Sequence, residues 1–233
     1  MDETEFINKE INKLAQFWVG IALFFGGLFF AILSILDYIA TPENFADFLK
    51  YRFIGAFIFA ILYVLNRRKI DKRYQLFMAY SGVISSAIII EYMILNFGGH
   101  SSTYYAGLFI LVMVVVGFIP MNFRDSIYLT SIVLSIYVIP IVFLDNSLNL
   151  KVFSMPLSFL IATFSIANVW RYLSQKRLIN ELSLQYELSK DKEQLAKYSA
   201  QLEELVQERT KELSMSEQRF RALFDNANDG VVV

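Results

Sequence analysis

The chain has no cysteine, a single histidine, four prolines and few charged residues. Without cysteine it can form no disulfide, no thiolate nucleophile and no cysteine-ligated zinc or iron–sulfur centre. Charged residues make up only 18% of the 233 residues and the net charge is −1, so there is no overall basic surface for nucleic acid. The composition therefore argues against a disulfide-rich domain, a cysteine enzyme and a nucleic-acid-binding protein.

Apolar residues, in contrast, are abundant: 56% of the chain is hydrophobic and 16% is aromatic, which is typical of a protein solvated largely by lipid. A helix needs roughly 20 apolar residues to cross the hydrocarbon core of a bilayer. The sequence predicts six such helices, over residues 17–39, 48–65, 74–97, 104–121, 126–144 and 152–173. The predicted fold class is an all-α integral membrane protein, a six-helix transmembrane bundle that continues into a parallel dimeric coiled coil.

The sequence divides into four predicted segments. Residues 1–16 are acidic and lack the basic start of a secretory signal, and their apolar residues share one helical face, so we expect a cytoplasmic amphipathic helix on the membrane surface. Residues 17–173 form the predicted transmembrane domain. Residues 174–215 form a cytoplasmic coiled coil, and residues 216–233 begin another segment that ends in a strand-like apolar run.

Lysine and arginine are distributed unevenly between the two ends of the predicted bundle. Eleven of them flank one end, where both termini lie, and three flank the other, namely Lys50, Arg52 and Lys151. Because cytoplasmic loops carry the excess of basic residues, both termini are predicted to be cytoplasmic. Residues 98–103 then face outward.

Ionisable residues in the apolar runs gather near the predicted outer end. Asp37 closes the first run, Arg52 begins the second and Glu91 lies near the end of the third, so Asp37 and Glu91 are both candidate partners for Arg52. Charged groups are costly in a membrane and need partners, which predicts a structural ion pair. The alternative is a ligand pocket for a small or hydrophobic molecule. Its candidate residues are Arg52, Glu91, Tyr92, Phe97, His100, Tyr104 and Tyr105.

His100 lies in a loop that contains Gly98 and Gly99. It is a candidate pH sensor, a loop hydrogen-bonding residue or a weak candidate ligand for a metal or haem. A single imidazole makes a poor metal site without further ligands from Glu91, Met93 or a second copy of the chain. We therefore predict no cofactor, with metal or haem at His100 as the open alternative.

After Arg171 the chain is rich in Glu, Lys, Gln and Leu and has no Gly or Pro up to Met215, which is typical of a continuous solvated helix. Its apolar residues repeat every seven positions, as in a parallel two-stranded coiled coil, although Asp191 interrupts the seam. The seam comprises Leu188, Leu195 and Leu202, with Leu184, Tyr198 and Leu205 at the complementary positions. Trp170 and Arg171 mark the inner boundary, where they are predicted to anchor the last transmembrane helix at the interface.

Three segments resemble parts of known signalling proteins. Residues 217–233, which begin Glu-Gln-Arg-Phe-Arg-Ala-Leu-Phe and reach Asp-Gly before an apolar run, resemble the opening helix and first strand of a PAS domain. Residues 202–213 are similar to linker helices that precede PAS and kinase modules in bacterial sensor histidine kinases. The loop 96–108 resembles one found in six-span sensor regions of such kinases and of nucleotide cyclases.

The resemblance implies a signal-input module of a sensor histidine kinase in a bacterial inner membrane. It also implies a homodimer, with a response regulator as the partner of domains beyond Val233. Signal would pass from the outer leaflet through Trp170 and Arg171 to the seam residues Leu188, Leu195 and Leu202. No nucleotide-binding loop, acidic metal pair or phosphoacceptor histidine is present, so catalysis would lie outside these residues. Alternatives are a membrane anchor for a nucleotide or cyclic-dinucleotide cyclase, a transporter and a haem-binding electron carrier.

Overall fold

The computed structural model describes residues 2–68 and 71–229, which form α-helices, one short 3-10 helix and the connections between them. Within these ranges there is no β-strand, so the prediction of an all-α chain is confirmed. The apolar run at residues 230–233 lies outside the described residues. The elements are α1 (Glu3–Ala40), α2 (Phe45–Asn66), α3 (Lys72–Asn96), η1 (Gly99–Ser101), α4 (Tyr105–Phe118), α5 (Phe123–Leu144) and α6 (Leu150–Asp229).

Five of the described helices, α1, α2, α3, α5 and α6, are long and apolar enough to cross a membrane. Helix α4 is also apolar but has only 14 residues, or about 21 Å at 1.5 Å per residue. The predicted helix over 104–121 is therefore shorter than expected. Pro120 explains the difference: a residue before proline is pushed out of the helical region, and Ile119 is extended with φ −78° and ψ 127°.

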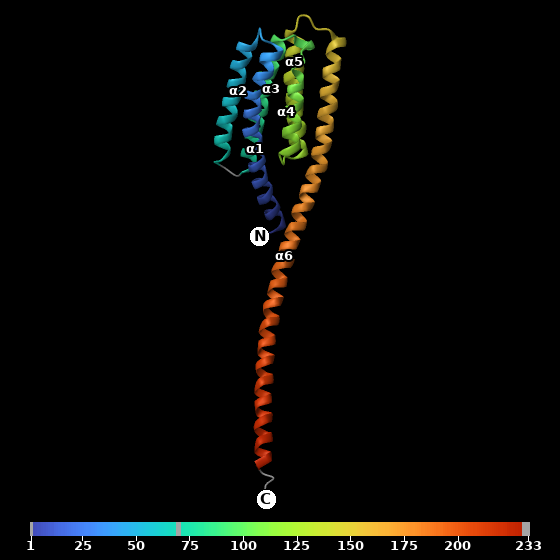
Figure 1. Ribbon diagram of the computed structural model, residues 1–233. Coiled ribbons are helices and arrows are strands. Elements are labelled where there is room, and N and C mark those ends of the chain that lie inside the picture. The colour runs from blue at the N-terminus through green and yellow to red at the C-terminus, as the bar shows by residue number, and fades with distance from the viewer. Residues whose placement is uncertain (1, 69–70, 230–233) are drawn as a thin grey trace. The chain divides into compact units, whose positions relative to one another are not determined.

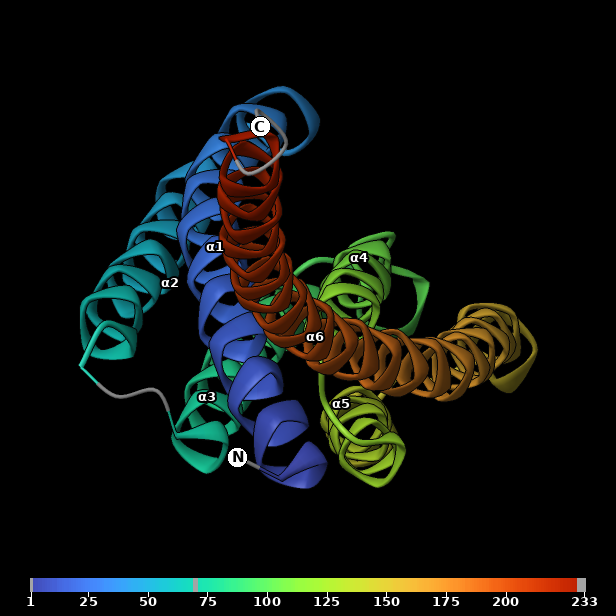
Figure 2. The same cartoon turned by 90° about the horizontal axis from the view of Figure 1, so that it is seen from below.

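The chain divides into two compact units, Met1–Leu182 and Ser183–Val233. In the first unit α3 is the central helix and contacts α1, α2, α4 and α5. Figure 1 shows these helices side by side, and Figure 2 shows them from below, with α2 on one side of α1 and α3 and with α4 and α5 on the other. One continuous apolar core joins these helices to the first part of α6, through residues such as Val83, Leu129 and Leu160.

The loops define two ends of this first unit. We name them the His100 end, with residues 41–44, 97–104 and 145–149, and the Arg171 end, with the α4–α5 turn at residues 119–122. Helix α6 attaches to its neighbours through large side chains. Phe159 contacts the rings of Tyr105 and Phe109, with centroids 6.4 and 5.6 Å apart, and Phe153 contacts Tyr137 at 5.8 Å.

Two helices run straight through predicted segment boundaries. Helix α1 begins at Glu3, capped by the carboxylate of Asp2, and continues without a break past residue 16. Helix α6 has 80 residues and continues through residues 173 and 215. Pro156 lies within its second turn, where it removes one amide donor but does not end the helix. Residues 217–229 are the last turns of this same helix rather than a separate one.

Candidate functional site

Arg52 and Asp37 form a buried ion pair at the His100 end. The guanidinium Nε donates to Asp37 Oδ2 at 2.9 Å and Nη2 donates to Oδ1 at 3.3 Å. Arg52 is 4% exposed and Asp37 is fully buried. Two further contacts complete the site: the hydroxyl of Tyr104 donates to Asp37 Oδ1 at 2.7 Å, and the Arg52 guanidinium lies over the ring of Phe30, 5.0 Å from its centroid. The expected partnership with Asp37 is present.

Aromatic rings close this ion pair off. Phe48, Phe97 and Tyr104 pack edge to face, with ring centroids 5.5 to 6.3 Å apart. Thr41 fixes the end of α1 nearby, because its hydroxyl donates to the Asp37 carbonyl at 3.0 Å. This buried ion pair, with its hydrogen bonds and the aromatic rings packed beside it, connects α1, α2 and the α3–α4 loop, as a structural ion pair does. This is the ion-pair alternative of the two that the sequence left open.

Glu91 does not join this cluster. It is 3% exposed in the first unit, and neither carboxylate oxygen has a hydrogen-bond partner among the described residues. Burying an ionised carboxylate without a partner is very unfavourable, so this geometry suits a neutral carboxylic acid.

The other predicted pocket residues are dispersed. Tyr92 is half exposed and packs against Tyr51, with centroids 4.8 Å apart, rather than facing Arg52. Tyr105 packs against Phe159 of α6. The seven candidate ligand residues are therefore split among the ion-pair cluster, the Glu91 site, the α3–α4 loop and the helix surface. Ligand binding at any one of them stays a prediction.

His100 links the α3–α4 loop to the α5–α6 loop. Its backbone N–H donates to Asp145 Oδ2 at 2.9 Å, and its ring Nδ1 lies 2.8 Å from the same oxygen. Its Nε2 accepts from the backbone N–H of Asn149 at 3.4 Å. This pattern fits a neutral ring with the proton on Nδ1. Gly99 has φ +54°, and a Cβ there would collide with the Asp145 carboxylate, so the close approach requires glycine.

We call the contacts among His100, Asp145 and Asn149 the outer latch, after the outward orientation that the sequence predicts for residues 98–103. Asn149 is the residue before α6, and its side-chain oxygen accepts from the N–H of Lys151 at 3.0 Å. Hydrogen bonds from Ser147 and from the backbone and ring of His100 lower the pKa of the Asp145 carboxyl below its usual range. Asp145 is therefore held as a carboxylate, and it fixes His100 against the first turn of α6.

A metal ion at His100 would have to displace a hydrogen bond, because both ring nitrogens already have hydrogen-bond partners. Among residues 2–68 and 71–229 no cluster of three or more His, Cys, Asp or Glu side chains has the spacing to hold a metal ion. Of the roles predicted for His100, the structure directly shows hydrogen bonding within the loops.

At the Arg171 end, α6 holds both sides of the α4–α5 turn. Arg171 Nη1 donates to the carbonyl of Ile119, just after α4, at 2.9 Å. Gln175 Oε1 accepts from the N–H of Phe123, at the start of α5, at 2.8 Å. Because the C-terminus of a helix is electronegative and the N-terminus offers free N–H groups, each side chain has the polarity its helix end requires.

Asn168 extends this contact by one turn of α6. It accepts from the hydroxyl of Ser126 at 2.7 Å, and its amide donates to the hydroxyl of Thr130 at 3.0 Å. Asn168, Arg171 and Gln175 lie three and four residues apart, so they share one face of α6. We name this face, with the residues it contacts on the α4–α5 turn and on α5, the inner clamp, after the cytoplasmic orientation that the sequence predicts for this end.

Arg171 is 2% exposed and points at the α4–α5 turn, and its predicted anchoring role at the membrane interface stays a prediction. The Ile119 carbonyl, which follows the end of α4 and also accepts from the Met121 N–H at 2.8 Å, is the group that orients the Arg171 guanidinium toward this turn. Trp170 is about half exposed, as a residue at the lipid interface would be, and its anchoring role stays a prediction.

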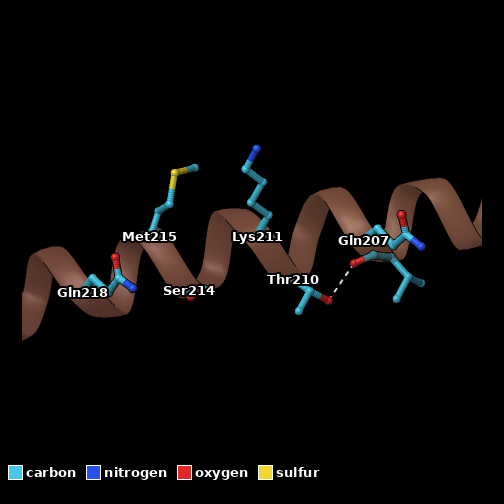
Figure 3. Close-up of a pocket in the computed structure, with 7 residues that line it drawn as sticks. Gln207, Thr210, Lys211, Ser214, Met215 and Gln218 are labelled. Carbon is cyan, nitrogen blue, oxygen red and sulfur yellow. Dashed lines mark hydrogen bonds between the residues drawn. The ribbon is translucent and has the colours of Figure 1, made fainter.

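The seam residues in the second unit are exposed. Leu188, Leu195 and Leu202 are 56%, 71% and 63% exposed, and Leu184, Tyr198 and Leu205 are also exposed. A second exposed strip begins at Val206 and ends at Gln218. Figure 3 shows that its side chains all come from one stretch of α6, where the only hydrogen bond drawn runs from the Thr210 hydroxyl to the Val206 carbonyl at 2.7 Å. A strip on one helix encloses no ligand.

Sequence reasoning missed Thr41, Phe48, Asp145, Asn168 and Gln175. Two of these carried a readable signal: Asn168 is an amide inside an apolar run, and Asp145 is the one acidic residue in the loop 145–149. Polar residues at such places need partners. Their partners lie 38 to 45 residues away in the sequence, and spacing alone does not identify them.

No protein-family model matches the chain, and no curated protein or solved structure is significantly similar to it. Its function must therefore be inferred from its own residues and their geometry.

Proposed function

We propose that this chain is the membrane-embedded signal-input module of a homodimeric sensor histidine kinase, which senses a stimulus in or near the outer leaflet. One observation carries the proposal. Helix α6 begins at the outer latch, passes through the inner clamp and continues without a break as a charged helix with an exposed leucine seam. A single helix thus contacts both ends of the apolar unit and continues into a charged one.

Six crossings are supported by how α4 connects the two ends of the first unit. The loop before α4 contacts Asn149 through His100, and the residue after α4 contacts Arg171. The 22 residue steps from Asn149 to Arg171 correspond to about 33 Å of helix, close to the thickness of a hydrocarbon core. Helix α4 is short, but together with the residues on either side of it the chain reaches from the His100 end to the Arg171 end.

The charge distribution supports placing the Arg171 end and both termini in the cytoplasm of a bacterial cell, with the His100 end outside. Exposed leucines at heptad spacing support a parallel dimer through the seam, since a long polar helix with an unpaired apolar stripe gains stability by burying it. The partners are then the bilayer and a second copy of the chain.

The mechanism we propose is a population shift. A stimulus at the His100 end favours one packing of the helices, and α6 transmits the change as a rotation or displacement. The inner clamp gives this step a physical form: a shift of the α4–α5 turn must move Arg171 and Gln175, and both lie on the helix that enters the second unit. The PAS-like and linker-like residues support a kinase output beyond this chain, which would act on a response regulator.

Insertions into α6 just after the inner clamp test this mechanism. One to three alanines inserted between Lys176 and Arg177 should lock or abolish output, because each residue rotates the seam by about 100° relative to the clamp. Seven inserted residues restore the register and should preserve stimulus response. The readout is stimulus-dependent phosphorylation in the full-length protein. Equal response at every insertion length would eliminate helical transmission.

A further inference from the structure

A groove between α1 and α2 at the Arg171 end is independent of the latch and the clamp. Its lining changes along its length: Lys13 and Arg67 lie at its polar end, and Phe17, Gly20 and Phe24 continue it along α1 toward the middle of the apolar unit. The 11 residue steps from Lys13 to Phe24 correspond to about 16 Å of helix. A cationic end followed by an aromatic and aliphatic channel of this length matches a lipid, with a charged headgroup and an acyl chain.

The groove is built by specific contacts. Gln16 and Asn66 hold α1 and α2 together through two reciprocal hydrogen bonds, in which each side-chain amide donates to the other residue's backbone carbonyl at 3.2 and 3.1 Å. A Cβ on Gly20 would come within 3.2 Å of the Asn66 amide nitrogen, so glycine permits the close approach of α1 and α2 at this point of the groove. The lining rings of Phe17, Phe24 and Phe25 are half exposed.

The cationic end is oriented in advance. The Arg67 guanidinium lies 4.8 Å from the ring centroid of Tyr63, and its Nη2 donates to the Tyr63 hydroxyl at 2.6 Å. No other described residue pairs with the Arg67 guanidinium, so its remaining N–H groups can bind an anion. Lys13 pairs with Glu10 at 2.7 Å, and a phosphate would compete with that partly exposed carboxylate for the exposed ammonium.

We propose that this groove binds one anionic phospholipid, with its phosphate between Lys13 and Arg67 and one acyl chain along Phe17, Gly20 and Phe24. Charge complementarity identifies the occupant as anionic, and the apolar channel identifies it as a lipid rather than free phosphate. The proposal rests on the membrane location of the chain. A lipid held there would join α1 to α2 at the end of the bundle where basic residues are concentrated.

The test is native mass spectrometry of the full chain released from nanodiscs that contain equal amounts of phosphatidylglycerol and phosphatidylcholine. Wild-type protein should retain one phosphatidylglycerol in clear preference to phosphatidylcholine. Lys13→Gln with Arg67→Gln should reduce that preference about 25-fold, or about fivefold for each removed charge. The matched control is Lys176→Gln with Arg177→Gln, which removes two exposed cations from α6 outside the groove and should leave the preference unchanged.

Three outcomes would overturn the proposal: equal retention of the two lipids by wild type, the same loss in both double variants, or full competition by inorganic phosphate. Lys13→Arg with Arg67→Lys keeps both charges and should retain phosphatidylglycerol, which separates a charge effect from misfolding. If the chain fails to incorporate into any nanodisc, the membrane location fails, and the proposed sensor function fails with it. Equal retention of the two lipids would leave that function untouched.

Discussion

Two buried sites that carry ionisable groups lie in the same helical unit and are built in opposite ways. Arg52 and Asp37 satisfy each other through two hydrogen bonds, with Tyr104 as a third partner. Glu91 is as deeply buried, yet its two carboxylate oxygens have no hydrogen-bond partner among the described residues. The first site fixes three parts of the chain, whereas the second leaves a polar group unsatisfied in the core.

The difference indicates where this structure can change. Removing one member of a satisfied buried pair leaves an uncompensated charge, so such a pair tolerates little rearrangement. An unsatisfied carboxyl is stabilised by any packing that offers it a hydrogen-bond partner. If a stimulus repacks the helices, we expect Glu91 to acquire a hydrogen-bond partner. We expect the Arg52–Asp37 ion pair to stay intact.

The largest predicted effect comes from Asp37→Ala. The substitution leaves the Arg52 guanidinium buried without its carboxylate, and we expect it to lower the free energy of unfolding by about 3–5 kcal/mol. The measurement is unfolding of the purified protein in mixed detergent micelles. The double variant Asp37→Leu with Arg52→Met should recover most of the loss, because it removes both charges. If the double variant is as unstable as Asp37→Ala, the loss does not come from the unpaired charge of Arg52.

The next largest change in stability is predicted for the outer latch. Asp145→Asn removes the charged acceptor for the ring and backbone of His100, and we expect a loss of about 2 kcal/mol. Because the folded-state pKa of Asp145 is lowered, its stabilising contribution is present above the unfolded value of about 4 and is lost as the pH falls through the folded value. The stability advantage of wild type over Asp145→Asn should therefore persist at neutral pH and decline in strong acid. An advantage that is constant down to the lowest accessible pH would contradict this assignment.

Glu91→Met should have a smaller effect of opposite sign. Methionine has a similar length and no polar atom to leave unpaired, so we expect the bundle to become more stable by about 1 kcal/mol. Glu91→Gln keeps a polar group there and should change stability less. If Glu91→Met instead destabilises the protein strongly, the carboxyl has a partner in the membrane, and the ligand-pocket alternative regains support.

These contrasts also define what could be read from the sequence. The helical fold followed from composition and run length, and the ion pair at Arg52 followed from the need of a buried guanidinium for a carboxylate. The choice between Asp37 and Glu91 did not follow, because it depends on which faces of α1, α2 and α3 meet. The early end of α4 was readable from Pro120, whereas the inward turn of Arg171 depends on a carbonyl 52 residues earlier in the chain.

The smallest effect is predicted for Asp47→Ala, which tests whether burial is what separates these sites. Asp47 accepts from Lys50 at 2.9 Å on α2, near Arg52, but both side chains of this pair are about 70% exposed. Water screens the pair and its side chains lose rotamer freedom when they meet, so we expect a change below about 0.5 kcal/mol in the same micelle assay. A loss comparable to that of Asp37→Ala would mean that proximity to the end of α2, rather than burial of the charge, makes an aspartate important there.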